Sequence, residues 1–89
     1  MTSILAQFKV QEYSKWRAVF DENASARAAE GMGAAKVFRD SNDGNSVALL
    51  LEVTDLDKAR AYADSDALKQ AQMKGGVIPP PTMTWLDDA

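Results

Sequence analysis

The chain has 89 residues, 46% hydrophobic and 26% charged, a composition typical of a globular domain rather than of a disordered segment or a coiled coil. We expect residues 1–89 to form one domain around one core. Ten basic and thirteen acidic side chains give a net charge of −3, which argues against nucleic acid or an anionic membrane as a partner. Cysteine and histidine are absent, which excludes disulfides, thiolate or imidazole catalysis, and histidine-ligated zinc or haem.

Two targeting signals are missing from the sequence. No basic region precedes an apolar run of signal-peptide length, and no apolar run approaches the ~20 residues that cross a bilayer. We therefore expect a cytoplasmic protein.

The first thirty residues change their hydrophobic period from two to about 3.6. Residues 4–10 alternate between apolar and polar side chains, which predicts a strand. From about residue 12 to residue 30, an apolar stripe at helical spacing predicts one long amphipathic helix that ends at Gly31. The stripe consists of Tyr13, Trp16, Phe20 and Ala24.

A hairpin and a second helical region follow. Residues 34–40 and 46–53 are predicted strands, joined by a turn rich in Asp, Asn and Gly. Thr54 and Asp57 resemble a capping box that opens a helix, and the chain restarts a further helical turn or two at residues 64–66.

The C-terminal region contains a linker and a last strand. Gly75 and Gly76 end the helical region, and three prolines, Pro79 to Pro81, make the segment before residue 82 a predicted linker. Residues 82–86 predict a short strand at the edge of the sheet. The predicted order is therefore β-α-β-β-α-β, with two helices on one face of a four-stranded sheet.

The predicted strand 46–53 is apolar on both faces. Ala48 and Leu50 leave Glu52 as the only charged residue on one face. The opposite face consists of Val47, Leu49, Leu51 and Val53. Burying each large side chain is worth ~1.5–3 kcal/mol, so we expect two copies to pack sheet against sheet as a homodimer. The alternative is that residues 46–53 form the central strand of a small monomer.

Several segments together resemble a known family. They are Tyr13 to Asp21, Val37 to Asp40, Asp43 to Asn45, Leu51 to Ala61, and Gly75 to Val77. The chain resembles the dimeric α/β barrel group of ferredoxin-like proteins, nearest to antibiotic-biosynthesis-monooxygenase-like and cyclase-like proteins. The resemblance implies an α+β ferredoxin-like fold, a four-stranded antiparallel sheet, and two sheets that close face to face in a dimer.

The resemblance also implies a kind of chemistry. In cofactor-free oxygenases of this fold, the substrate donates an electron to dioxygen, and the protein supplies a dry aromatic cavity. The haem-degrading branch needs an axial histidine, and Ala61 to Ala63 occupy the region where the monooxygenase branch often has one. We therefore expect no cofactor.

The aromatic stripe is the first candidate site. Its commonest role is core packing. Its functional role would be to line a pocket between helix and sheet, with the Tyr13 hydroxyl as a hydrogen-bond donor and with Trp16 and Phe20 as a wall. We add Trp85 as a further substrate-binding candidate, and Arg39 as a group that binds an anionic or enolate oxygen.

Glu52 is the second candidate, because a carboxylate in an apolar strand has a raised pKa and is suited to act as a general base. The alternative is an ion pair with Lys9, Lys36 or Arg39 inside the dimer. The remaining helix cations are expected to be exposed: Arg17, Arg27, Lys58 and Arg60.

We predict no metal site and no phosphate-binding loop. Asp55, Asp57, Asp64 and Asp66 lack the spacing of a calcium loop and lie where helix starts favour carboxylates. No Gly-rich phosphate-binding pattern occurs either.

Two functions follow from the sequence. One is a cofactor-independent, monooxygenase-like enzyme acting on an aromatic or polyketide-like molecule. The other is a dimer that binds a small molecule without turnover, or that serves as a structural or regulatory module. RNA binding on the sheet would need a basic surface and exposed aromatic residues, which fit this chain least.

Overall fold

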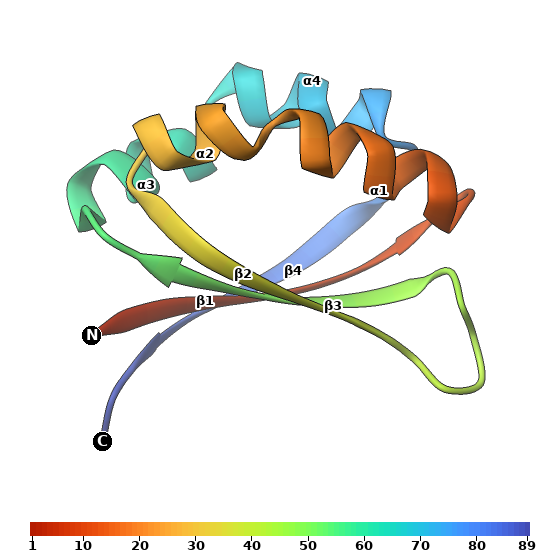
Figure 1. The fold of residues 1–89 in the computed structure, drawn as a ribbon, viewed down its shortest axis with the longest axis horizontal. Coiled ribbons are helices and arrows are strands. Elements are labelled where there is room, and N and C mark those ends of the chain that lie inside the picture. Colours follow the sequence, from red (N-terminus) through yellow and green to blue (C-terminus); the bar gives the residue numbers. More distant parts are fainter.

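A computed structural model describes all 89 residues as a four-stranded antiparallel sheet with every helix on one face (Figure 1). The strand order is β2-β3-β1-β4. The strands are β1 (Thr2–Val10), β2 (Met32–Arg39), β3 (Ser46–Val53) and β4 (Val77–Asp87). The helices are α1 (Tyr13–Glu22), α2 (Ala24–Ala29), α3 (Leu56–Ala63) and α4 (Asp66–Lys74). The predicted α+β ferredoxin-like fold is confirmed.

The predicted long helix is in fact two helices that meet at Asn23. Asn23 has φ −91° and ψ 9°; it ends α1, and its carbonyl oxygen accepts a 2.9 Å hydrogen bond from the Arg27 backbone N–H in α2. Asparagine is a weak helix former that favours helix ends. The apolar stripe continues across this junction, which is why the helical period alone did not locate the break.

Strand β4 is longer than predicted and includes the segment assigned to a linker. Its first residues pair with β1, with Val77 opposite Val10 and Ile78 opposite Lys9. Pairing resumes with Thr82 opposite Gln7, so the three prolines between them lie in a bulge. Prolines lack a backbone N–H and cannot donate to a neighbouring strand. Because β4 is an edge strand with β1 as its one neighbour, the prolines break no pairing with a second strand.

The helix-facing side of the sheet carries the core. The predicted alternation in β1 and β3 is confirmed, since the even-numbered residues of β1 and the odd-numbered residues of β3 face the helices. The buried apolar residues are Ile4, Ala6, Val10, Trp16, Met32, Val47, Leu49, Leu51, Val53 and Ala59.

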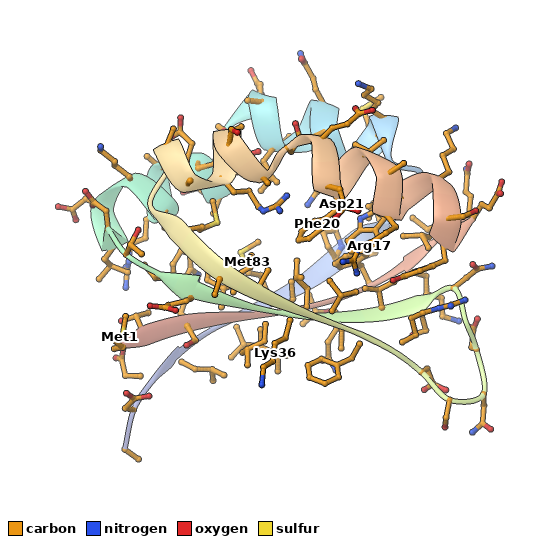
Figure 2. The ribbon with its side chains drawn as sticks, in the orientation of Figure 1. Met1, Arg17, Phe20, Asp21, Lys36 and Met83 are labelled. Atoms are coloured by element: carbon orange, nitrogen blue, oxygen red, sulfur yellow. The ribbon has the colours of Figure 1, made fainter.

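The opposite side of the sheet carries no helix and is partly apolar. Figure 2 shows Lys36 pointing away from the helices on this side. By strand register, Leu50 lies beside Lys36 and opposite Leu5, and all three share this open face. Phe38, Ile78 and Leu86 also lie on the open face and are 53%, 46% and 40% exposed.

The two ends of the chain lie side by side (Figure 1). The Met1 ammonium is 3.2 Å from an Asp88 carboxylate oxygen, next to the pairing of Thr2 with Asp87. None of the four helices combines the length and the apolar character needed to cross a membrane.

Candidate functional site

A cavity of about 110 Å³ lies between the helices and the sheet. Residues from all four helices and from all four strands line it, and most of them are apolar. The strands contribute Ile4, Ala6, Phe8, Met32, Leu49, Leu51, Val77, Pro81 and Met83, and the helices contribute Trp16, Val19, Phe20, Arg27, Ala59, Tyr62, Ala63, Leu68, Ala71 and Gln72. Figure 2 shows Phe20 and Met83 pointing into the space between the layers.

Trp16 and Phe20 form an aromatic wall of the cavity. They lie one helical turn apart on α1, and their rings are stacked with centroids 4.9 Å apart at 24°. Phe8 of β1 packs against Trp16 at 5.3 Å. Gly75 packs closely against the Trp16 ring, since a Cβ added at this position would lie 3.1 Å from the indole Cδ1.

Arg27 is the one charged residue of the lining, and the sequence prediction that it is an exposed helix charge is wrong. Its guanidinium lies 3.6 Å from the centroid of the Phe20 ring, and its Nη1 donates a 2.5 Å hydrogen bond to the Phe20 carbonyl oxygen. Burial lowers the pKa of Arg27 below its ordinary value. The sequence did hold a signal for this placement, because Arg27 follows Phe20 by seven residues, or two helical turns.

Tyr62 of α3 is a second polar group of the cavity. Its side chain is half-buried, and its hydroxyl makes no hydrogen bond to another protein group. Burial raises the pKa of Tyr62, against the opposing effect of the Arg27 charge. The hydroxyl therefore keeps its proton at neutral pH and remains available as a donor. In the sequence analysis, Tyr62 lies in the region where the monooxygenase branch often has a histidine, and no role is predicted for it.

Tyr13 and Arg39 lie together outside the cavity lining. The Arg39 guanidinium is 3.9 Å from the centroid of the Tyr13 ring, and Arg39 Nε donates a 2.9 Å hydrogen bond to the Gly44 carbonyl oxygen. Arg17 Nη1 donates a 3.4 Å hydrogen bond to the Tyr13 hydroxyl. Tyr13 packs on Trp16 at 5.9 Å, so it supports the aromatic wall from the hairpin end of the molecule.

Glu52 lies on the open face of the sheet, opposite Ser3, and cannot reach a molecule held in the cavity. No cation lies within 4 Å of its carboxylate, and Lys9 pairs with Asp43 at 3.8 Å instead. Arg39 is on the helix-facing side by register, which removes it from the possible partners of Glu52 on this chain.

Trp85 lies on β4 beside a separate surface groove. Its ring is 5.4 Å from the Arg60 guanidinium, and both residues line this groove between α3, α4 and β4. The groove and the cavity share lining residues, among them Leu68, Gln72 and Met83. The candidate residues predicted from the sequence therefore fall in separate places, and of these only Trp16 and Phe20 line the cavity.

Three of the four aspartates predicted to cap helices lie at helix starts. The Asp55 side chain accepts a 3.2 Å hydrogen bond from the Lys58 backbone N–H at the start of α3, and Asp57 and Asp66 lie in first turns. Asp55, rather than Thr54, is the N-cap residue. The prediction is wrong for Asp64, which is the C-cap residue of α3; the N-cap of α4 is Ser65, whose hydroxyl oxygen accepts a hydrogen bond from the Leu68 backbone N–H.

The cavity can bind and orient a flat molecule, but it has no side chain suited to take a proton. Its lining contains neither a carboxylate nor an imidazole, and its polar groups are Arg27, Tyr62 and Gln72. A cation in an apolar site lowers the pKa of an acidic ligand nearby, because it stabilises the ligand's anion. Arg27 is placed to act in this way.

No family model and no curated protein matches this sequence. Solved structures do match. SnoaB, a cofactor-independent oxygenase from Streptomyces nogalater, is 15% identical, with 99% of this chain and 92% of SnoaB covered and a TM-score of 0.77. A candidate antibiotic biosynthesis monooxygenase from Bordetella bronchiseptica is 12% identical, with 99% and 96% covered and a TM-score of 0.81.

A second candidate antibiotic biosynthesis monooxygenase, from Caulobacter crescentus, is 19% identical, with 99% of this chain and 89% of that chain covered and a TM-score of 0.75. Identities this low establish the fold and do not establish the reaction. The resemblance drawn from the sequence is confirmed at that level: the chain has the ferredoxin-like fold of antibiotic-biosynthesis-monooxygenase-like proteins.

Proposed function

We propose that the protein is a cofactor-independent, monooxygenase-like enzyme that oxidises a small aromatic molecule in the cavity between helices and sheet. The observation that carries the proposal is the cavity itself, an apolar space walled by Trp16 and Phe20 with a single guanidinium inside it. An apolar pocket with few polar groups is the usual form of a small-molecule site. SnoaB, which shares the fold, is a cofactor-independent oxygenase.

The proposed reaction needs little from the protein. A phenol-type substrate whose keto tautomer has a ring CH₂ loses a proton to water, and its anion gives electrons to dioxygen. In the net reaction one oxygen atom replaces the two hydrogens of that CH₂ to give C=O. The other oxygen atom leaves as water, which takes up the hydrogen of the ring carbon and the proton first given to solvent. Arg27 stabilises the substrate anion electrostatically, and the aromatic wall orients the ring. The apolar lining keeps water away from the reacting atoms.

Oxygen uptake with a panel of quinol-type and anthrone-type substrates tests this proposal. We expect uptake that Ala63→Phe abolishes, because Ala63 lines the cavity and a phenyl group would fill it. Ala61→Phe is the matched control, since Ala61 is exposed on the same helix. Absence of uptake across the panel would contradict the proposal.

We further propose that the protein, with residues 1–89 as one domain, is a homodimer that closes over the open face of the sheet. The apolar side chains on that face support this, because Phe38 and Ile78 are 53% and 46% exposed in one chain. Glu52, Lys9 and Lys36 would then lie in the shared interior, where an ion pair can form. Light scattering should give twice 9.7 kDa, and particles of 9.7 kDa alone would contradict the dimer.

A second candidate function is ligand binding without turnover. The absence of any carboxylate from the cavity lining favours it, because no protein group there can act as a general base. A ligand that raises the Tm and is recovered unchanged supports binding alone. A ligand that is consumed supports the enzyme.

A further inference from the structure

Arg27 differs from the other arginines in having a buried donor without a partner. Its Nε is out of contact with solvent and makes no hydrogen bond, and no carboxylate lies within 4 Å of the guanidinium. Arg17, on the preceding helix, has Asp21 at 3.1 Å from its Nε; Figure 2 shows that pair. The charge of Arg27 is thus left without a counter-ion.

An unpaired cation at an apolar cavity is costly unless something compensates it. A guanidinium stays protonated in proteins, so Arg27 cannot relieve the cost by losing its proton. The Phe20 carbonyl oxygen accepts a hydrogen bond from the guanidinium and the Phe20 ring packs against it, but the Nε–H has no hydrogen-bond partner. An anionic oxygen in the cavity would compensate the charge of the guanidinium and accept a charge-assisted hydrogen bond from it.

Tyr62 supplies a second donor to the same cavity. Its hydroxyl makes no hydrogen bond to another protein group, and Tyr62 and Arg27 line the same cavity from α3 and α2. Together, the Arg27 guanidinium and the Tyr62 hydroxyl offer donors to the cavity, and the lining contains no carboxylate. Such a pair selects an oxygen anion over a cation or an amine.

The volume of the cavity limits what can carry that anion. A cavity of about 110 Å³ is smaller than the ~150 Å³ apolar cavity that accommodates one benzene molecule, so it holds at most one ring. The stacked rings of Trp16 and Phe20 offer an aromatic wall to such a ring. A fused polycyclic molecule would have to extend into the neighbouring groove beside Met83.

We infer that the cavity binds a single aromatic ring bearing one anionic oxygen substituent, a carboxylate or phenolate, with the Arg27 guanidinium as the anion receptor and the Tyr62 hydroxyl as the second donor. This inference rests on the site of the proposed function and names its ligand class. It requires binding only, and turnover is a separate question.

Calorimetric titration with benzoate and with its neutral isostere benzamide tests the inference. Wild-type protein should bind benzoate at least about tenfold more tightly than benzamide, the difference expected for one charge-assisted hydrogen bond. Arg27→Gln should bring the ratio close to one and leave the benzamide Kd within about twofold. Arg17→Gln is the matched control and should keep the wild-type ratio, because Arg17 is paired with Asp21 outside the cavity.

Further arms keep the inference testable if Arg27→Gln fails to fold. Tyr62→Phe should weaken benzoate binding and leave benzamide binding unchanged. Inorganic phosphate should bind much more weakly than benzoate; equal binding would mean a simple ion site and would overturn the assignment of a ring. Equal affinities for benzoate and benzamide in the wild type, or a preference that survives Arg27→Gln, would overturn the role of Arg27.

The result separates this inference from the proposed oxygenase activity. Oxygen uptake without a preference for benzoate over benzamide would reject Arg27 as the anion receptor and would still support the oxygenase activity. A preference that depends on Arg27, without uptake of oxygen by any ring anion, supports the receptor and rejects the oxygenase.

Discussion

Gly31 lies where the chain passes from α2 into β2, with φ of +83°. Its backbone N–H donates a hydrogen bond to the Ala28 carbonyl oxygen. Its own carbonyl oxygen accepts hydrogen bonds of 2.8 and 3.2 Å from the backbone N–H groups of Thr54 and Asp55. A Cβ at this position would press against the Asp55 carbonyl oxygen. Gly31→Ala should therefore lower the free energy of unfolding by about 1–3 kcal/mol, measured by urea denaturation.

Gly44→Ala is the control for this prediction. Gly44 has no positive φ, and the atom that its added Cβ would meet is Arg39 Nη2, at the end of an exposed side chain. That side chain can move away at the cost of one solvent-exposed hydrogen bond, from Arg39 Nε to the Gly44 carbonyl oxygen. We expect this variant to change the unfolding free energy by less than about 0.5 kcal/mol. Equal losses in the two variants would show that backbone conformation is not the cause.

Tyr62 should make stability depend on pH in the alkaline range. Burial raises its pKa above 10.0 in the folded chain, so the folded state holds the phenolic proton more tightly than the unfolded state. The associated stability is fully present below about pH 10 and is lost as pH rises through the folded pKa. Tyr62→Phe should therefore make the unfolding free energy fall less steeply than in wild type as pH rises above about 10, as followed by denaturant titration.

The predictability of the site differs from residue to residue. Trp16 and Phe20 were found because large apolar side chains at a spacing of four mark one helix face. Arg27 continues that face, but a cation is ordinarily assigned to solvent, and its place in the cavity lining depends on tertiary packing. Tyr62 was missed for the same reason, since only tertiary packing brings it to Arg27.

Helix α3 begins with a cap whose contribution can be isolated. The Asp55 carboxylate accepts the hydrogen bond of the Lys58 backbone N–H, whereas Asp57 lies in the same first turn without capping it. Asp55→Ala should cost about 1 kcal/mol of unfolding free energy, and Asp57→Ala only a few tenths, on the order of 0.3 kcal/mol. Chemical denaturation of the two variants compares them directly; equal effects would contradict a specific cap.

Element types were predictable and element ends were less so. Strands 4–10 and 46–53 have clear period-two patterns, and the structure places β1 and β3 over them as the two central strands. The prolines before residue 82 argued against a strand, yet β4 begins at Val77 because edge pairing with β1 tolerates a bulge there. Local propensity cannot reveal a bulge that a neighbouring strand determines.

The molecule as a whole presents an apolar sheet face opposite its helices. If a second copy covers this face, a charge placed there should separate the copies. Phe38→Lys is expected to shift light-scattering mass from twice 9.7 kDa towards 9.7 kDa at micromolar concentration. Leu56→Lys is the control: Leu56 is 38% exposed but begins helix α3, on the other side of the molecule, and its mass should stay unchanged.

Consecutive residues of β3 point to opposite faces of the single sheet. Leu49 lines the cavity, and Leu50 lies on the face open to a second copy. A ligand in the cavity and a second copy on the open face would therefore contact the same strand from its two sides. If binding of the ligand changes the affinity between the copies, thermodynamic reciprocity requires that pairing of the copies changes the affinity for the ligand by the same factor. In that case the fraction of dimer would depend on the concentration of the ligand, and dilution of the protein would change its apparent affinity for the ligand.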